Sequence, residues 1–312
     1  MSRSQILLAL SLYKSRNRLS LPISKKEQKN RMQTKTLCFV PLFLALFLSY
    51  TISSSAYSFN FDYFYNGTDL MTFYGDAEYA PEPDGMSKSG GIGLSRENIP
   101  FSHGRAIFIN PIPFKPSASS SYIYSFKTSF NFDITSRKQN PNPGHGLAFI
   151  VVPHNKNETV SGLGYLSLVN RFNNGNPNNH LFAVEFDVFK DASLGDINDN
   201  HVGININSAN STVSKKAGYW IQSRTGGINR WVFKALKLSD NGCKAWIEYE
   251  NAKVIVTIGP SQEKPKRPLI EARLDLSKVF HEKMYTGFAG STGRDAERHE
   301  ISDWSFENSA KN

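Results

Sequence analysis

The chain has 312 residues and a formal net charge of +9, from 36 lysine and arginine residues against 27 aspartate and glutamate residues. Nine of the basic residues and one acid lie in the first 56 residues, which leaves a net charge of about +1 on the remaining 256. A folded part so close to neutral argues against a nucleic-acid partner, which calls for an excess of positive charge.

Residues 32–56 have the layout of a secretory signal peptide. A short basic lead, MQTKT, precedes the apolar run Leu37 to Tyr50, and Ser54-Ser55-Ala56 supplies small residues for cleavage. The apolar run has 14 residues, and about 20 are needed to cross a bilayer as a helix. We therefore expect a secreted, soluble product with no membrane span. Residues 1–31 precede this signal and are expected to be a non-structural upstream extension, with translation beginning at Met32.

Only two cysteines are present, and Cys38 lies within the predicted signal. The mature chain is then left with Cys243 alone and cannot form an internal disulfide. In the alternating stretch CKAWIEYE, Cys243 is expected to be a small buried hydrophobe. Three N-x-S/T sequons, at Asn66, Asn157 and Asn210, become glycosylation sites if the chain is secreted.

From Tyr57 onward the apolar residues recur with a period of two, which indicates β-strands. In chain order, the predicted strands are SFNFDYF (58–64), SFKTSFNFDI (125–134), LFAVEFDVF (181–189), HVGINI (201–206), GYWIQ (218–222), RWVFKALKL (230–238), KAWIEYE (244–250), KVIVTIG (253–259) and DWSFEN (303–308). Clusters of Gly, Pro, Asn and Ser separate them. Only LIEARLDLSKVF (269–280) has a pattern that would accommodate one or two helical turns.

Many short strands with long loops predict an all-β fold, an antiparallel jelly-roll β-sandwich in one domain, residues 57–312. The 22 phenylalanines suit two sheets packed face to face. Because the first and last segments are both strands, we expect the two chain ends to close the same sheet.

The stretch from Val184 to Ile204 concentrates five carboxylates and one histidine. Glu185 and Asp187 are two residues apart on a predicted strand and so leave the same face. Such a pair is typical of a retaining glycosidase. Jelly-roll endoglucanases place a second glutamate two or three residues later, where this chain has Phe189 and Lys190. Hydrolysis therefore remains a minor hypothesis.

An EF-hand calcium loop is a second interpretation of the same stretch. From Asp196 the pattern Asp-x-Asn-x-Asn fits, but His201 replaces the glycine and Asn207 replaces the glutamate that the loop requires. An EF-hand also needs flanking helices, and the flanks here are predicted strands. This interpretation fails.

A site for two metal ions is the third interpretation. Asp187 and Asp196 can each bridge two ions, and Glu185 with His201 would complete a set suited to Mn²⁺. Asp191 and the carbonyl of Phe189 would complete an all-oxygen set suited to Ca²⁺. The alternative is a solvated acidic loop, which a charge cluster by itself also fits.

These residues resemble the metal-binding loop of the legume (L-type) lectin family: Glu-x-Asp-x-aromatic, then an acid, an Asp and a His. Further motifs agree, namely GHGLAFIVVP (144–153), GLGYLSLVN (162–170), HVGININS (201–208) and MYTGFAGSTGRDAERHEISDWSF (284–306). The resemblance runs from about Ser58 to Glu307 and is strongest to soluble lectin-like proteins of crucifers and to the lectin domain of plant lectin receptor kinases. It implies a sandwich of the legume-lectin (concanavalin-like) type.

By this resemblance, the first ion, Mn²⁺, would be held by Glu185, Asp187, Asp196 and His201. The second ion, Ca²⁺, would be held by Asp187, Phe189 through its carbonyl, Asp191 and Asp196. Ser211 is expected in the outer shell of the first ion.

The family's monosaccharide pocket lies above the calcium, and two of its polar positions are altered here. His145 stands where the family has an Asp that accepts two sugar hydroxyls, and neutral imidazole offers a single acceptor. Asp191 stands where the family has an Asn, and it lacks the amide donor. Phe189 remains as an apolar platform, Gly164 matches the second loop, and Arg294 with Asp295 occupies the fourth. Binding of ordinary mannose or galactose is therefore not expected.

The resulting expectation is a non-enzymatic, glycosylated, carbohydrate-binding protein of the apoplast or cell wall, with a role in plant defence. Its partners would be glycans or glycoproteins of the cell wall or of microbes, with a homodimer formed edge to edge as the family's usual assembly. Two hypotheses remain open: a lectin of altered specificity, and a lectin-fold protein that has lost sugar binding and acts through protein or hydrophobic-ligand contacts.

Overall fold

The computed structural model describes residues 57–62, 64, 70–80, 90–96, 98–136, 144–239, 242–260, 262–294 and 297–309. All of them belong to one compact unit, Ser54–Asn312. The predicted extension and signal, residues 1–56, lie outside the described residues, so the division of the chain at these points stays a prediction. Among the described residues, no helix reaches the length and apolar character of a membrane span.

Eight strands form one sheet, called the back sheet, in the order β16–β15–β14–β7–β18–β4–β3, with β1 also paired to β18. Every pair is antiparallel. The strands are β1 (Tyr57–Phe61), β3 (Glu78–Ala80), β4 (Gly91–Gly93), β7 (Ser125–Ser136), β14 (Cys243–Glu250), β15 (Lys253–Gly259), β16 (Ile270–Arg273) and β18 (Glu297–Ser309).

The other eight-stranded sheet, called the front sheet, has the order β11–β10–β9–β8–β17–β5–β2, with β6 paired to β17. Its strands are β2 (Met71–Gly75), β5 (His103–Phe108), β6 (Ile112–Pro113), β8 (Gly146–Val152), β9 (Phe182–Asp187), β10 (His201–Ile206), β11 (Ser211–Lys216) and β17 (Lys283–Ser291). These pairs are antiparallel as well.

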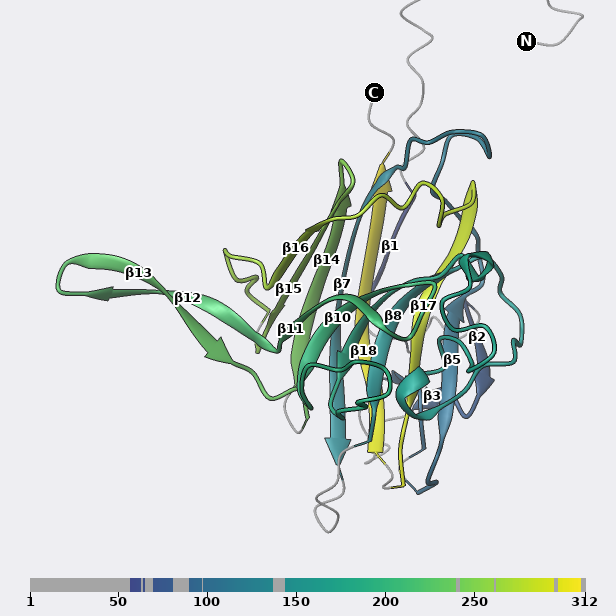
Figure 1. The fold of residues 1–312 in the computed structure, drawn as a ribbon, viewed down its shortest axis with the longest axis horizontal. Helices are drawn as coiled ribbons and strands as arrows, with labels where there is room; N and C mark the ends of the chain where they lie inside the picture. Colours follow the sequence, from purple (N-terminus) through teal and green to yellow (C-terminus); the bar gives the residue numbers. More distant parts are fainter. Residues whose placement is uncertain are drawn as a thin grey trace, which may run out of the picture. The chain divides into compact units, whose positions relative to one another are not determined.

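Two strands and two 3₁₀ turns of the described chain lie outside the two sheets. β12 (Gly218–Thr225) and β13 (Ile228–Ala235) form a separate two-stranded sheet, which Figure 1 shows extending away from the body of the sandwich. Two 3₁₀ turns, η3 (Leu163–Tyr165) and η4 (Pro177–Asn179), lie in the long connection between β8 and β9.

The core between the two sheets is built from alternating aromatic residues. Trp304 on β18 is fully buried, and its ring lies 4.6 Å from Phe59 and 4.9 Å from Phe288 between centroids. Its indole N–H donates to Thr128 Oγ1 at 2.9 Å, so the one polar atom of the ring is satisfied. Phe130 of the back sheet meets Phe288 of the front sheet at 4.9 Å. These contacts join the layers that the two-residue period predicted.

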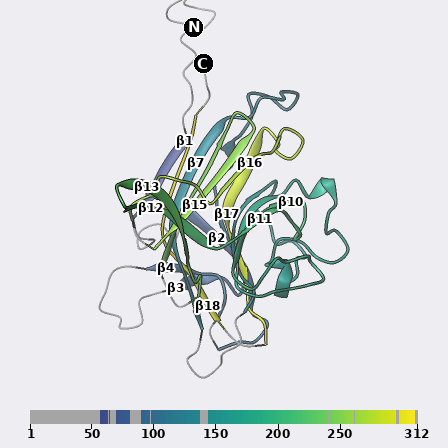
Figure 2. The same cartoon turned by 60° about the vertical axis from the view of Figure 1, so that its left-hand side comes forward.

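The front sheet is buried on its outer face too. Along β8, Leu147, Phe149 and Val151 belong to the core between the sheets, whereas Ala148, Ile150 and Val152 belong to a second apolar cluster on the other side. Leu166, Leu168 and Val169 of the following connection cover that cluster. Figure 2 shows these teal loops beyond β10 and β17, on the side away from the back sheet. A strand covered on both faces reads as the continuous apolar run GLAFIVV.

The sequence predictions of fold class hold. The structure is nearly all β, with antiparallel sheets, and β1 pairs with β18, so the chain ends close one sheet as expected. Cys243 is buried, and burial raises the pKa of its thiol to about 12, as suits an inert apolar position. For residues 269–280, where one or two helical turns were predicted, the structure agrees only in part. The first half forms the edge strand β16, and one α-type turn follows, in which Phe280 N–H donates to Leu276 O.

Replacing Trp304 by Ala should lower the free energy of unfolding by about 3–5 kcal/mol, because it opens a cavity between the sheets. Thr128→Val should cost about 1–3 kcal/mol, because it leaves the buried indole N–H unpaired. Urea unfolding followed by fluorescence measures both. Phe172→Ala, at a side chain 83% exposed, is the matched control, and an equal cost there would contradict the assignment of Trp304 to the core.

Candidate metal and carbohydrate site

The alternation of β9 delivers two carboxylates to the outer face of the front sheet. Val184 and Phe186 point into the core between the sheets, so Glu185 and Asp187 point the opposite way. Loops cover them there, and their exposed fractions are only 2% and 3%. Two adjacent carboxylates with this degree of burial are rare unless another group compensates their charge.

His201 begins β10 and lies directly across from Asp187 in the β9–β10 register. Its imidazole is fully buried, with Nε2 3.4 Å from Glu185 Oε1 and 3.9 Å from Asp196 Oδ1. Nδ1 lies 2.9 Å from the carbonyl of Asn198, which identifies Nδ1 as the protonated nitrogen of the neutral ring. The lone pair of Nε2 then faces the carboxylates, where the structure gives it no aligned hydrogen-bond partner.

The loop from Phe189 to Asp196 is held by its own carboxylates. Phe189 N–H donates to Asp187 Oδ1 at 2.8 Å, and Asp191 N–H donates to Asp196 Oδ2 at 2.6 Å. Ser193 donates to Asp191 Oδ1 from both its backbone N–H and its hydroxyl. These local bonds bring the predicted ligands Asp187, Asp191 and Asp196 together although they span ten residues.

Protonation shows the electrostatic cost of this arrangement. Burial raises the pKa of Asp187 well above its ordinary value, and the charges of Glu185 and Asp196 add to the effect. Burial likewise raises the pKa of Asp196. For His201, burial lowers the pKa, but the close approach and charge of Glu185 together with the charge of Asp196 outweigh it, and the net shift is upward. Without a cation, this environment therefore favours the protonated forms of these groups.

The donor set fits a metal site. One ligand atom each from Asp187, Asp196 and His201 lies within 4.8 Å of the other two, and Glu185 lies beside His201. In the part of the chain that the structure describes, no lysine or arginine forms an ion pair with any of these four. Three carboxylates and one imidazole suit a transition metal such as Mn²⁺, and the oxygen atoms around Asp191 suit Ca²⁺.

Glu185 is oriented by neighbours, of which the sequence identified only Ser211. Asn205 Nδ2 donates to Glu185 Oε2 at 2.7 Å, and the Ser211 hydroxyl donates to Glu185 Oε1. Gly203, opposite Glu185, is required because a Cβ there would come within 2.3 Å of Oε1. Hydrogen bonds of this kind to a metal-binding carboxylate set the direction in which it points. The polar residue Asn205 in the apolar strand HVGINI was the available signal.

His145 lies under the predicted sugar pocket rather than within reach of it. Its side chain is 6% exposed, and its ring packs on Phe189 with the centroids 4.5 Å apart. Its carbonyl accepts from Val188 N–H at 3.2 Å, while Nδ1 is buried without a partner. Burial lowers the pKa of His145 to about 4, so the ring is neutral near pH 7.

The structure brings the four predicted pocket loops together. A Cβ on Gly164 would lie 2.7 Å from Asp191 Oδ2, and one on Gly293 would lie 3.5 Å from the His145 ring. Arg294 follows Gly293 and is exposed. Asp295 lies outside the described residues. Phe189 is 39% exposed and remains available as an apolar platform.

One aromatic residue near this pocket was missed. Phe101 is 53% exposed, and its N–H donates to the carbonyl of Gly293 at 2.8 Å, which places it beside the fourth loop. Its φ of +59° is unusual for a residue that is not glycine. The Pro100-Phe101 turn was the signal in the sequence, but an isolated aromatic in a loop does not reveal what lies next to it.

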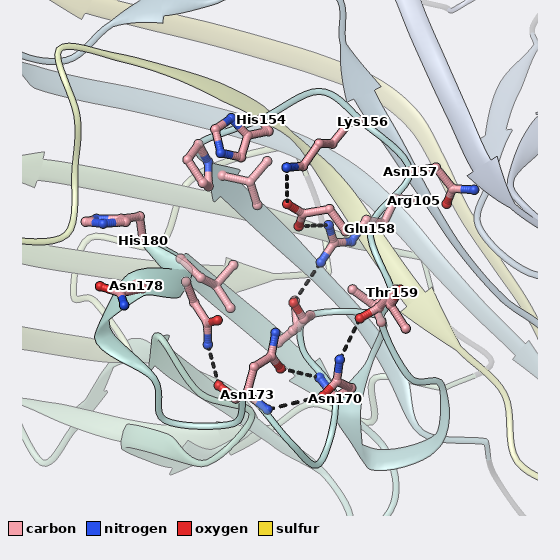
Figure 3. Close-up of a pocket in the computed structure, with 16 residues that line it drawn as sticks. Arg105, His154, Lys156, Asn157, Glu158, Thr159, Asn170, Asn173, Asn178 and His180 are labelled. Atoms are coloured by element: carbon pink, nitrogen blue, oxygen red, sulfur yellow. Dashed lines mark hydrogen bonds and ion pairs between the residues drawn. The ribbon is translucent and has the colours of Figure 1, made fainter.

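A second hollow of about 510 Å³ lies at the other ends of β8 and β9. Figure 3 shows that its polar side chains mostly bind one another. The buried Arg105 donates to the carbonyls of Ser167 and Leu168 and forms an ion pair with Glu158 at 3.2 Å. Asn170 Nδ2 donates to Thr159 O. These bonds fasten the long connection to the front sheet, so we assign the hollow a structural role.

The three sequons differ in accessibility. Asn157 is exposed at the rim of that hollow. Asn210 Nδ2, the atom that would carry a glycan, donates to Leu194 O at 2.6 Å. Asn66 lies outside the described residues. Glycosylation at all three stays a prediction.

The comparisons with known proteins agree with this geometry. Residues 56–312 match the family model "Legume lectin domain". The chain is 80% identical over 241 residues to a lectin-like protein of Arabidopsis thaliana, covering 77% of this chain and all of that one. It is 38% identical over 277 residues to an L-type lectin-domain containing receptor kinase of the same plant, covering 88% of this chain and 38% of the kinase.

A solved structure is similar as well. Arcelin-5, a lectin-like defense protein from Phaseolus vulgaris, is 25% identical, with a TM-score of 0.62 over 82% of this chain and all of that one.

Divalent ions should stabilise the protein, and more so at higher pH. A carboxyl group whose pKa is raised by folding favours the fold below about pH 4, and that contribution is lost as the pH rises through the folded value. In EDTA, Asp187 and Asp196 should therefore weaken the fold between pH 5 and pH 8. Ions at about a hundredfold above Kd should add roughly 2.7 kcal/mol.

Differential scanning calorimetry in EDTA and in Ca²⁺ with Mn²⁺, at pH 5 and pH 8, measures this response. The control is Asp187→Asn, which should be more stable than the native protein in EDTA at pH 8 and should gain little from the ions. An equal gain in both proteins would argue against the site.

His145 should make the fold sensitive to acid. Because its pKa is lower in the folded protein, the neutral ring's contribution is present above pH 6.5 and is lost as the pH falls towards 4. The loss should approach about 2–3 kcal/mol. His145→Phe keeps a ring against Phe189 but cannot titrate, so its unfolding free energy should fall less between pH 7 and pH 4. Parallel pH curves for the two proteins would show that His145 is not responsible.

Proposed function

Because this chain belongs to the legume lectin family, we propose that it is a carbohydrate-binding protein whose altered pocket lies above a two-metal site. The resemblance seen in the sequence is confirmed, both to the lectin-like proteins and to the lectin domains of receptor kinases. The jelly-roll sandwich of the legume-lectin type is confirmed by the family match and the similar solved structure.

One observation carries the proposal: Glu185, Asp187, Asp196 and His201 share a buried site in which the described residues provide no lysine or arginine. A solvated acidic loop, the alternative that the sequence left open, would leave these side chains in water. Burying several carboxylates without compensation is unfavourable by several kcal/mol. Divalent cations would remove that cost, which supports a metal site here.

The two ions would divide these residues between them. Glu185, Asp187, Asp196 and His201 would hold Mn²⁺, and Asp187, Asp191, Asp196 and the carbonyl of Phe189 would hold Ca²⁺. When bound, the ions supply positive charge that replaces the protons of the cluster. The chain's own role is to orient Phe189 and Asp191 towards the pocket, which the hydrogen bonds from Phe189 N–H and from Ser193 already begin.

The pocket favours ligands other than simple neutral monosaccharides. His145 is buried beneath Phe189 and offers a sugar no carboxylate. Asp191 can accept hydrogen bonds but cannot donate them. The exposed Arg294 adds a positive charge beside Phe189's loop, and Phe101 adds a second apolar face. We propose larger or acidic glycans as the ligand class.

Secretion to the apoplast or cell wall, and a role in plant defence, extend the proposal. The layout of residues 32–56 supports secretion. The similarity to a structure whose title names a lectin-like defense protein supports the second point. Glycans or glycoproteins of the cell wall or of microbes would then be the partners, and the exposed edges of the two sheets would serve a homodimer.

Hydrolysis has less support. Glu185 is held by Asn205 and Ser211, and no carboxylate follows it at Phe189 or Lys190. A retaining glycosidase needs a second acid about 5–5.5 Å from the nucleophile and able to exchange protons with the substrate. Glucan hydrolysis that Glu185→Gln abolishes would revive this hypothesis.

The second candidate is a lectin-fold protein that no longer binds sugars. It is favoured by one observation, the packing of the His145 ring against Phe189 where a sugar-binding carboxylate would stand. Loss of one or two charge-assisted bonds, each about 1.5–3 kcal/mol, is enough to abolish a millimolar site of about 4 kcal/mol. Such a protein would act through protein contacts or hydrophobic ligands.

A glycan array separates these possibilities. Protein beginning at Tyr57 should bind in Ca²⁺ and Mn²⁺ and lose at least about 90% of its signal in EDTA, because the pocket depends on the ions. His145→Asp should add binding of simple monosaccharides. Asp187→Asn is the matched control and should be silent.

Silence of the folded native protein, with no gain in a folded, metal-loaded His145→Asp variant, would replace the first candidate by the second. Binding that EDTA leaves unchanged would contradict the metal-supported pocket itself.

A further inference from the structure

The hairpin of β12 and β13 is a feature that the sandwich does not explain. The two strands pair only with each other, over eight residue pairs from Gly218–Ala235 to Thr225–Ile228. On β13, every side chain except that of Phe233 is exposed. An isolated two-stranded hairpin is only marginally stable in water, so packing alone does not account for a ribbon of this length (Figure 1).

Positive charge is concentrated in the segment that contains this hairpin. The 23 residues from Lys215 to Lys237 contain six basic residues and no acid, whereas the rest of residues 57–312 contains 21 basic and 26 acidic residues. All six side chains are exposed: Lys215, Lys216, Arg224, Arg230, Lys234 and Lys237. The net charge of residues 57–312 is near zero because the basic segment Lys215–Lys237 offsets the negative charge of the remainder.

One face of the hairpin is aromatic. Cross-strand partners share a face, so Trp220 and Phe233 lie beside Gln222 and Trp231. Trp220 and Phe233 meet edge to face at 5.3 Å. The guanidinium of Arg267 lies over the Trp220 ring at 4.2 Å and reaches Trp231 at 6.0 Å.

The loop after β15 faces these rings across a cleft of about 350 Å³. Pro260 and Pro265 form part of its wall, and Lys266 lies exposed on its rim. Trp231 is 41% exposed. The cleft thus combines flat apolar surfaces with cations, and its one acid, Glu263, is exposed.

We propose that the β12–β13 hairpin and residues 262–267 of the loop after β15 form a binding site for an acidic polysaccharide of the polyuronate class. The apolar face of a pyranose ring would stack on Trp231, and its carboxylates would pair with Arg224, Arg267 and Lys266. This site goes beyond the proposed function, since it uses none of the loops around Phe189 and needs no metal ion.

The distribution of charge favours a linear polymer. On the face that carries Trp231, Arg224 lies near the tip of the hairpin, whereas Arg267 lies over Trp220 nearer its base, with Lys266 next to it in the chain. Trp220 and Arg224 are four strand residues apart, roughly 13 Å, so a chain of several sugar residues can meet cations at both positions. A single small anion would need them gathered at one point.

The tip of the hairpin disfavours a lipid surface. Residues 224–230 read Arg-Thr-Gly-Gly-Ile-Asn-Arg, with Ile228 as the one large apolar side chain. Inserting it into a bilayer would carry two arginines and the peptide groups of two glycines towards the hydrocarbon, at a cost of several kcal/mol. A polymer in water requires no such transfer.

The test compares ligands and variants in EDTA, so that the two-metal site plays no part. Binding of the full folded chain to immobilised polygalacturonate is measured at 50 and 200 mM NaCl. Methyl-esterified polygalacturonate is the uncharged control polymer. We expect binding to the charged polymer only, weakened at least about tenfold by the higher salt.

Two sets of variants locate the site. Arg224→Gln, Lys266→Gln and Arg267→Gln combined should weaken binding about tenfold or more, because three charge contacts are lost. The combined Arg273→Gln, Lys278→Gln and Lys283→Gln variant removes three exposed charges elsewhere and should change binding less than about twofold. Trp231→Ala should weaken binding about threefold or more, and Trp231→Phe should retain most of it.

Equal effects of the two charge variants, or equal binding of the esterified polymer, would overturn the proposal. Tighter binding to vesicles containing 30% phosphatidylserine, or to a single-stranded oligothymidine, would replace the polyuronate by a lipid or a nucleic acid. Thermal melting confirms that each variant is folded. Because EDTA is present throughout, failure of the metal-supported pocket would leave these outcomes unchanged.

Discussion

The aromatic contact between the two sheets is the constraint on which the remaining structure depends. Trp304, Phe130 and Phe288 meet where β18, β7 and β17 cross, and no polar atom is left unpaired there because Thr128 accepts the indole N–H. This core fixes the orientation of β9, with Val184 and Phe186 pointing inward. The side chains that alternate with them must therefore point outward. Glu185 and Asp187 therefore emerge on the outer face as a consequence of packing Val184 and Phe186.

That outer face is unusual because loops cover it and exclude water. The connection between β8 and β9 folds back over the front sheet and is anchored by Arg105, which donates to two carbonyls and pairs with Glu158. The burial that this connection provides changes the chemistry of the carboxylates beneath the neighbouring loops. In water they would be ordinary ionised acids, whereas here burial favours their neutral forms unless cations are supplied. The proposed metal site therefore depends on the exclusion of water by these loops.

The two altered pocket positions have different physical effects. At Asp191, the carboxylate remains in the loop, bonded to Ser193, and keeps its oxygen atoms near the cluster. At His145, the side chain turns inward, loses its charge through burial and supports Phe189 from below. The first change keeps oxygen atoms in the loop but offers acceptors alone, without an amide donor. The second places a buried ring against Phe189.

The sequence was enough to predict the fold class, nine of the strands and the family, because a two-residue period and closely spaced motifs are local properties of the chain. It also identified Glu185, Asp187, Asp196 and His201, since their spacing is part of that motif. Contacts between residues distant in sequence required the folded structure: Asn205 and Gly203 lie against Glu185, Phe101 lies beside Gly293, and His145 is buried. The folded structure also showed that β12 and β13, correctly predicted as strands, belong to neither large sheet. A two-residue period in the sequence indicates that a segment is a strand. It does not indicate which strand that segment pairs with, because pairing depends on contacts between residues distant in sequence.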